Sequence, residues 1–143
     1  MNRRVAVAKW IHVAVVALAS ALAHAATAQS PVHPQTPSTT VGTWRGTSVC
    51  LVHPSACNDE IVVYRITPKK GVDSVALDAR KIVRGEEQEM GVLGCHLVST
   101  SGQLTCAMPK GVWRFRVRND SLTGELRLLD DTRYRVVRAI RAP

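Results

Sequence analysis

The chain has 143 residues, of which 45% are hydrophobic and 21% charged, with a formal net charge of +8 and a pI near 9.9. This length provides one hydrophobic core, and it excludes a second domain once an N-terminal export segment is set aside. The sequence contains no strong catalytic or metal-binding motif, so its fold is better specified than its function.

Residues 1–28 have the organisation of a signal peptide. Arg3, Arg4 and Lys9 form a positive n-region, and the apolar run Trp10–Ala23 has the length of a signal-peptide core. Two Ala-x-Ala sites follow, and we predict cleavage after Ala28, which lowers the net charge from +8 to +5 by removing the three basic residues. The alternative is a retained membrane helix, for which the run is short. We therefore expect a periplasmic or secreted protein without a transmembrane anchor after cleavage.

Residues 29–40 are expected to be a disordered linker, because proline, serine and threonine predominate there. Residues 41–143 then form the folded domain, in which short apolar/polar alternating runs are separated by turn signals. Eight antiparallel strands with local connections are typical of an up-and-down β-barrel, which leaves no exposed edge; an open β-sandwich is the alternative. The expected strands are Gly42–Leu51, Glu60–Thr67, Ser74–Val83, Met90–Val98, Gln103–Met108 and three more within Gly111–Ile140.

The stretch Gly111–Ile140 gives the clearest strand signal, because three alternating runs are separated by the turn pairs Asn119-Asp120 and Asp130-Asp131. Period-two alternation places successive side chains on opposite faces of a strand. The stretch therefore predicts a β-meander with one apolar and one basic face. The residues expected to point inward are Trp113, Phe115, Val117, Leu122, Gly124, Leu126, Leu128, Tyr134, Val136 and Ile140.

Four cysteines lie in the mature domain, and an even number in a small exported chain indicates two disulfides. Three pairings are possible, and we predict Cys50–Cys57 and Cys95–Cys106. The second follows from register, since a turn near residues 100–102 places Cys95 opposite Cys106. Zinc is the alternative, but the CxxC spacing is missing, so we expect no metal site.

The triplet Gly42-Thr43-Trp44 resembles the G-x-W opening of the calycins, the superfamily of lipocalins, fatty-acid-binding proteins and avidins. The resemblance covers the strand count of the mature domain, and its specific part is the triplet plus one arginine. It implies a tryptophan near the closed end of the barrel, covered by an arginine of the last strand. Arg138 is the first candidate for this structural partner of Trp44, and Arg141 is the second. A small secreted protease inhibitor with a similar barrel is an equally good relative.

Catalysis is not expected. A triad of Ser48, His53 and Asp59 can be drawn, but no motif such as G-x-S-x-G supports it. We predict a protein that is not an enzyme and that has no cofactor. An acidic cluster is interpreted as a solvated connector: Glu86, Glu87 and Glu89.

Two functional hypotheses remain. In the first, a lipocalin-like barrel binds a small apolar ligand through the inward residues Trp113, Phe115 and Tyr134. In the second, a filled barrel binds an acidic protein or envelope component, as an interaction module or protease inhibitor, through an arginine face or the Cys50–Cys57 loop. Guanidinium groups favour carboxylate and phosphate partners; nucleic acid is not expected, and the protein is expected to be a monomer. The six arginines of that face are Arg114, Arg116, Arg118, Arg127, Arg133 and Arg135.

Overall fold

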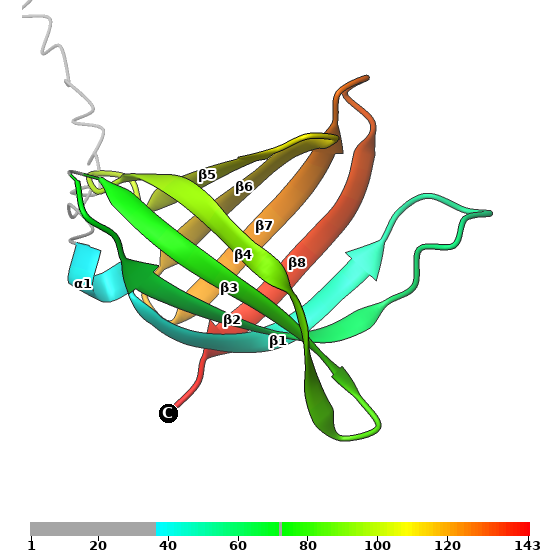
Figure 1. The fold of residues 1–143 in the computed structure, drawn as a ribbon, viewed down its shortest axis with the longest axis horizontal. Helices are drawn as coiled ribbons and strands as arrows, with labels where there is room; N and C mark the ends of the chain where they lie inside the picture. Colours follow the sequence, from blue (N-terminus) through cyan, green and yellow to red (C-terminus); the bar gives the residue numbers. More distant parts are fainter. Residues whose placement is uncertain (1–36, 72) are drawn as a thin grey trace, which may run out of the picture. The chain divides into compact units, whose positions relative to one another are not determined.

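A computed structural model describes residues 37–71 and 73–143; the predicted signal peptide and residues 29–36 lie outside this range. The described chain forms a closed antiparallel barrel in which each strand pairs with the next and the last strand pairs with the first (Figure 1). The predicted barrel is confirmed, and it is compatible with a calycin-like fold. The elements are α1 (Pro37–Thr40), β1 (Gly42–Cys50), β2 (Glu60–Pro68), β3 (Ser74–Val83), β4 (Glu86–Val98), β5 (Gln103–Met108), β6 (Gly111–Arg118), β7 (Ser121–Leu128) and β8 (Arg133–Arg141).

The core lies inside the barrel, because alternate side chains of each strand point inward. The inward phases predicted for β3, β6 and β7 are confirmed by the burial of Leu77, Phe115 and Leu122. Gly124 lies opposite Phe115 in the β6–β7 ladder, and a Cβ atom there would come within 2.3 Å of the phenyl ring. The absence of a side chain at Gly124 therefore gives the ring its space. Other members of the core are Trp44, Val62, Tyr64, Ile66, Val75, Leu97, Leu104, Val117 and Val137.

The predicted phase of the last strand is wrong beyond its first residue. Val137 and Ala139 are buried, whereas Ile140 is 66% exposed. The cause is a bulge: Leu126 pairs with Arg135, but Arg127 pairs with Arg133, so the residue between the two arginines has no partner in the β7–β8 ladder. One extra residue moves every later side chain of the strand to the other face.

Both predicted disulfides are present, Cys50–Cys57 and Cys95–Cys106. The predicted register of the β4–β5 hairpin is also confirmed, since Leu97 lies opposite Leu104. Disulfides form and persist in oxidising compartments, so they are consistent with an extracellular or periplasmic protein. No helix of the described residues is long and apolar enough to cross a membrane.

The acidic stretch interpreted as a connector is instead part of β4. The turn itself consists of Arg84 and Gly85, both with positive φ, and Glu86 and Glu87 continue the β3–β4 hairpin beyond the wall of the barrel (Figure 1). Glu87 accepts two hydrogen bonds from Arg65, at 2.7 and 2.9 Å. This bidentate pair ties the hairpin to the neighbouring strand β2.

The closed end of the barrel is built around Trp44, which is fully buried. Its indole Nε1 donates to the carbonyl oxygen of Thr40 in α1 at 3.1 Å, within the stretch that the sequence suggested to be a linker. The arginine over its ring is Arg141, with the guanidinium carbon 4.3 Å from the ring centroid. Arg138 points outward and is exposed, so the second candidate is the partner and the first is not.

Candidate ligand-binding cavity

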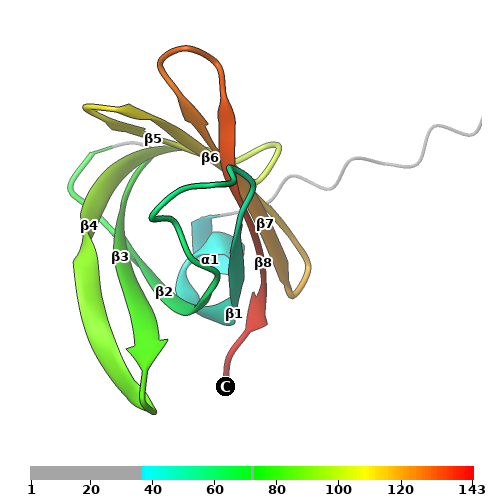
Figure 2. The same ribbon diagram turned by 90° about the vertical axis from the view of Figure 1, so that its right-hand side faces the viewer.

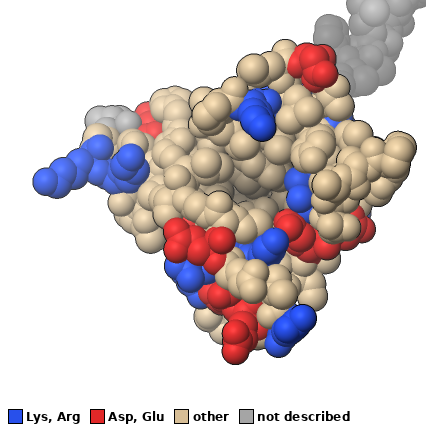
Figure 3. Space-filling model, turned by 45° about the vertical axis from the view of Figure 1, so that its right-hand side comes forward, with Lys and Arg blue, Asp and Glu red and all other residues tan. Residues whose placement is uncertain are grey.

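A cavity of about 160 Å³ lies in the half of the barrel opposite α1. Figure 2 looks along the barrel, with α1 at the far end and the β1–β2 loop at the near end. The face in Figure 3 is hollowed near its centre, and acidic and basic side chains lie beside the hollow. Aromatic and aliphatic side chains form most of the wall, and polar groups form one corner.

The aromatic part of the wall consists of three rings from neighbouring inward positions. Trp113 stacks on Phe115 with their centroids 5.1 Å apart and their planes inclined by 12°. Tyr64 meets Phe115 edge-on at 5.7 Å. Trp113 is half-buried, because one part of its indole borders the cavity. The aliphatic part of the wall comes from Leu77, Ala79, Met90, Leu93 and Met108.

The polar corner is organised by Arg135, whose side chain is only 13% exposed. Its Nε donates to Ser48 Oγ at 2.9 Å, and Nη2 donates to the carbonyl oxygens of Ser48 and Asn58 at 3.2 and 2.6 Å. Nη2 also lies 3.1 Å from Glu60 Oε2, while Glu60 Oε1 lies 3.6 Å from Lys81 Nζ. These three charged groups carry one net positive charge. Within residues 37–71 and 73–143, no hydrogen bond uses Nη1 of Arg135, which leaves its N–H groups available.

Tyr64 adds a second polar group whose chemistry is set by its environment. Burial raises the pKa of the Tyr64 phenol well above its usual range, and the nearby positive charge of Arg135 only partly offsets this effect. The hydroxyl therefore stays protonated at physiological pH. It is hydrogen-bonded to the side chain of Ser48, and it supplies no negative charge to the cavity.

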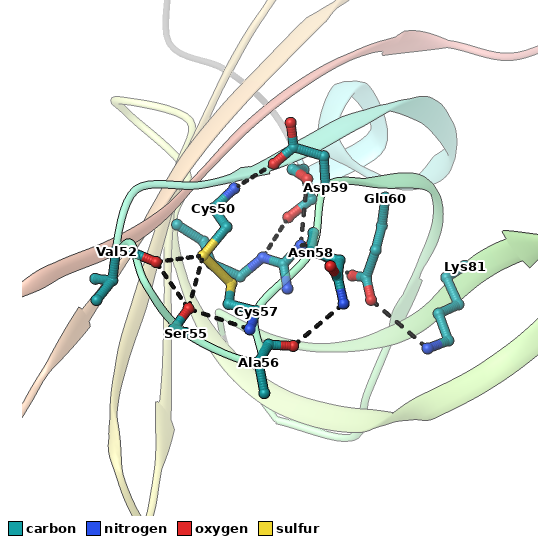
Figure 4. A network of polar contacts seen from close by, with 11 residues as sticks. Cys50, Val52, Ser55, Ala56, Cys57, Asn58, Asp59, Glu60 and Lys81 are labelled. Atoms are coloured by element: carbon teal, nitrogen blue, oxygen red, sulfur yellow. Dashed lines mark hydrogen bonds and ion pairs between the residues drawn. A yellow bond between two sulfur atoms is a disulfide. The ribbon is translucent and has the colours of Figure 1, made fainter.

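The rim beside this corner is fixed by the Cys50–Cys57 disulfide (Figure 4). Asp59 Oδ1 accepts a hydrogen bond from the backbone N–H of Cys50 at 2.8 Å, and Ser55 Oγ donates to Val52 O at 2.7 Å. The loop carries the carbonyl oxygen of Asn58 that Arg135 binds. The disulfide therefore acts on the cavity indirectly, by holding one acceptor of the arginine in place.

The candidate site residues are distributed differently from the prediction. Trp113 and Phe115, two of the three residues proposed to bind an apolar ligand, line the cavity. Tyr134 is half-buried, is the extra residue of the β8 bulge, and is not among the lining residues. Ser48, Tyr64 and Glu60 were not predicted to line a cavity, and Arg135 was predicted to lie on the outer arginine face. One signal in the sequence could have identified Arg135 as an inward residue. Arg135 and Arg141 are six residues apart, and residues an even number apart on a strand share a face. Choosing Arg141 as the inward partner of Trp44 therefore also places Arg135 on the inner face.

The drawn triad does not assemble. Ser48 Oγ accepts from Arg135, Asp59 bonds to the backbone of Cys50, and His53 Nε2 lies 3.2 Å from the carbonyl oxygen of Cys50. No group of three or more potential metal ligands occurs in the part of the chain that the structure describes.

The six arginines predicted to form one outward face fall into three groups. Arg135 lies inside the barrel, so its assignment to the face is wrong. Arg127 and Arg133 are outward, but both are bound to Glu125, with N–O distances of 2.9 Å. Their proximity lowers the pKa of the Glu125 carboxyl, mainly through the hydrogen bond from Arg127. Three remain fully exposed on β6: Arg114, Arg116 and Arg118.

Comparison with known proteins finds no family model that matches this chain and no curated protein with significant sequence similarity. We therefore infer the function from the geometry of the cavity and of the barrel surface.

Proposed function

We propose that the protein binds a small, mainly apolar molecule in the mouth of the barrel, with a hydrogen-bond-accepting or anionic head directed toward Arg135. The observation that carries this proposal is the cavity itself, which combines an aromatic and aliphatic wall with one polar corner. Ligand sites in proteins have this composition: a mostly apolar concave surface and a few polar groups that fix orientation.

The volume limits the size of the ligand. A buried apolar cavity of roughly 150 Å³ accommodates benzene, and the present cavity has about 160 Å³. One aromatic ring or a short branched chain fits this space, whereas a long acyl chain would extend out of the mouth. The stacked rings of Trp113 and Phe115 offer an apolar surface for such a group.

The polar corner selects the head group. The N–H groups on Nη1 of Arg135 are donors, and the cluster of Arg135, Lys81 and Glu60 has a net positive charge. A carboxylate or another strong acceptor is therefore favoured over an ammonium group.

The test compares benzoate, benzyl alcohol and benzylamine, which share a ring and differ in the head group, by isothermal titration calorimetry. We expect affinity to fall in that order. Ala79→Leu fills the cavity from a lining position and should abolish binding without loss of thermal stability. Ala107→Leu is the matched control, because Ala107 is exposed on the outer face of β5.

Each outcome has a defined meaning. Binding of none of the three compounds to the wild-type protein contradicts the proposal. Equal loss in Ala79→Leu and Ala107→Leu places binding outside the cavity. Tightest binding of benzylamine retains the cavity as the site but overturns the role of Arg135.

A further inference from the structure

The outer wall of β6, β7 and β8 carries a row of exposed polar side chains that the cavity does not use. Arg116 pairs with Thr123 in the β6–β7 ladder, and Thr123 pairs with Arg138 in the β7–β8 ladder. Gln103 of β5 and Thr47 of β1 extend the row on its two sides. Strands are spaced by about 4.8 Å, so the Cα atoms of the two arginines lie about 10 Å apart, with a small hydroxyl residue between them.

Two surface hollows follow this row. One, of about 320 Å³, is bordered by Arg114, Arg116 and Gln103. The other, of about 390 Å³, is bordered by Arg138, Thr47 and Ser121. Thr123 borders both, so the two hollows lie next to each other on the outer wall, and together they are called the trough.

The arginines of the trough differ from the other arginines in their pairing. Within residues 37–71 and 73–143, no ion pair involves Arg114, Arg116 or Arg138, whereas Arg65 is bound to Glu87. The carboxylate that borders the trough, Glu125, is already held by two arginines.

Asp120, a carboxylate in the β6–β7 turn, forms an ion pair with Arg141. The trough therefore presents guanidinium groups without an ion pair in the described chain, and these groups can bind an anion from outside it.

We propose that this trough binds an anionic polysaccharide, with sulfate or carboxylate groups on Arg116 and Arg138 and sugar hydroxyls on the threonines between and beside them. Guanidinium groups bind such anions through paired N–H donors. Threonine and glutamine side chains both donate and accept hydrogen bonds, as the hydroxyls of a sugar do. Charges about 7 Å apart along β6 and about 10 Å apart across the strands suit a polymer that bears repeated anionic groups.

The alternatives fit the trough less well. Single-stranded nucleic acid requires aromatic side chains on which bases can stack, but Phe115, the aromatic residue that borders the trough, is only 3% exposed. An acidic peptide would match the charge without using the row of hydroxyl and amide groups. Single-stranded nucleic acid and an acidic peptide are therefore both included as competing ligands in the experiment.

The experiment measures binding of a size-defined heparin oligosaccharide to the oxidised mature protein at low salt. Arg116→Gln with Arg138→Gln should weaken binding roughly tenfold or more and reduce the dependence of log affinity on log salt by about two. Lys70→Gln with Lys110→Gln is the matched control: both lysines are exposed in turns outside the trough, and the change in net charge is identical. Binding to this control should stay within about threefold of wild type.

Equal weakening by the two double variants would mean attraction by net charge alone and would overturn the assignment of the trough. Binding of a thymidine oligomer or an oligoglutamate at least as tight as that of heparin would overturn the assignment to polysaccharide. Thermal unfolding of each variant, and of Arg116→Gln and Arg138→Gln separately, establishes that the fold is retained. Benzoate binding to the cavity is measured in parallel and should be unchanged, so this proposal and the proposed cavity function fail independently.

Discussion

Replacement of Arg141 by alanine should destabilise the barrel strongly, although the residue is third from the C-terminus. The guanidinium stacks on Trp44 at 4.3 Å, Nη1 donates to Val41 O at 3.0 Å, and Nη2 donates to Thr39 O. A cation–π contact contributes about 0.5–2 kcal/mol. A hydrogen bond from a charged donor contributes roughly 1.5 kcal/mol or more, at the lower end where the side chain is partly exposed. We therefore expect Arg141→Ala to lower the free energy of unfolding by about 3.5–5 kcal/mol.

The control is Arg138→Ala, which removes an exposed guanidinium with no hydrogen bond or ion pair in the described chain and should change stability by about 0.5 kcal/mol or less. Arg141→Lys should fall between the two, because lysine keeps the charge but lacks the planar fork. Urea unfolding with intact disulfides, followed by circular dichroism, measures all three. A loss below about 0.5 kcal/mol for Arg141→Ala, or an equal loss for Arg138→Ala, would refute the closed-end structure.

Three further changes test other parts of the barrel. Gly124→Ala should lower the free energy of unfolding by about 1–3 kcal/mol, because the new methyl group collides with Phe115; an unchanged urea midpoint would show that the ring has free space. Glu125→Gln should lower stability by about 0.5–1 kcal/mol at neutral pH. Since the folded-state pKa of Glu125 is lowered, this difference should be complete above the ordinary value of 4.5 and disappear as the pH falls through the lowered pKa; a difference that persists in strong acid would contradict the ion pairs. Replacing Cys95 and Cys106 together by alanine should remove about 3 kcal/mol through loss of loop closure, and thermal unfolding that matches wild type would argue against this bridge.

The sequence predicted the barrel well where alternation was unambiguous. In β6, Trp113 and Phe115 alternate with arginines, so only one phase buries apolar surface. The last strand is different, because both of its phases contain apolar side chains and arginines. Which of the two phases points inward depends on the β7–β8 bulge and on the pairing of β8 with β1. Neither feature can be recognised from the amino-acid composition of β8 itself.

The same ambiguity hid the polar corner of the cavity. Arg135 was assigned to the surface because it alternates with Tyr134 and Val136, which were predicted to point inward, and Ser48 had no recognisable motif. Their meeting depends on the closure of β8 onto β1, a contact between residues 87 positions apart in the sequence. The aromatic wall was accessible from the sequence because Trp113 and Phe115 are inward positions of a single strand.

The central claim is that the mouth of the barrel holds a small ligand, and the methionine methyl groups test it most directly. Met90 and Met108 both line the cavity and are the two methionines of the described chain. The mature protein, which lacks Met1 after the predicted cleavage, should give two resonances when its methionine methyl groups are labelled with ¹³C, and both should shift when benzoate is added. The shifts should saturate at one ligand per protein and should be lost in Ala79→Leu. If neither resonance moves while benzoate is in excess, the cavity does not bind such a ligand and the account is contradicted.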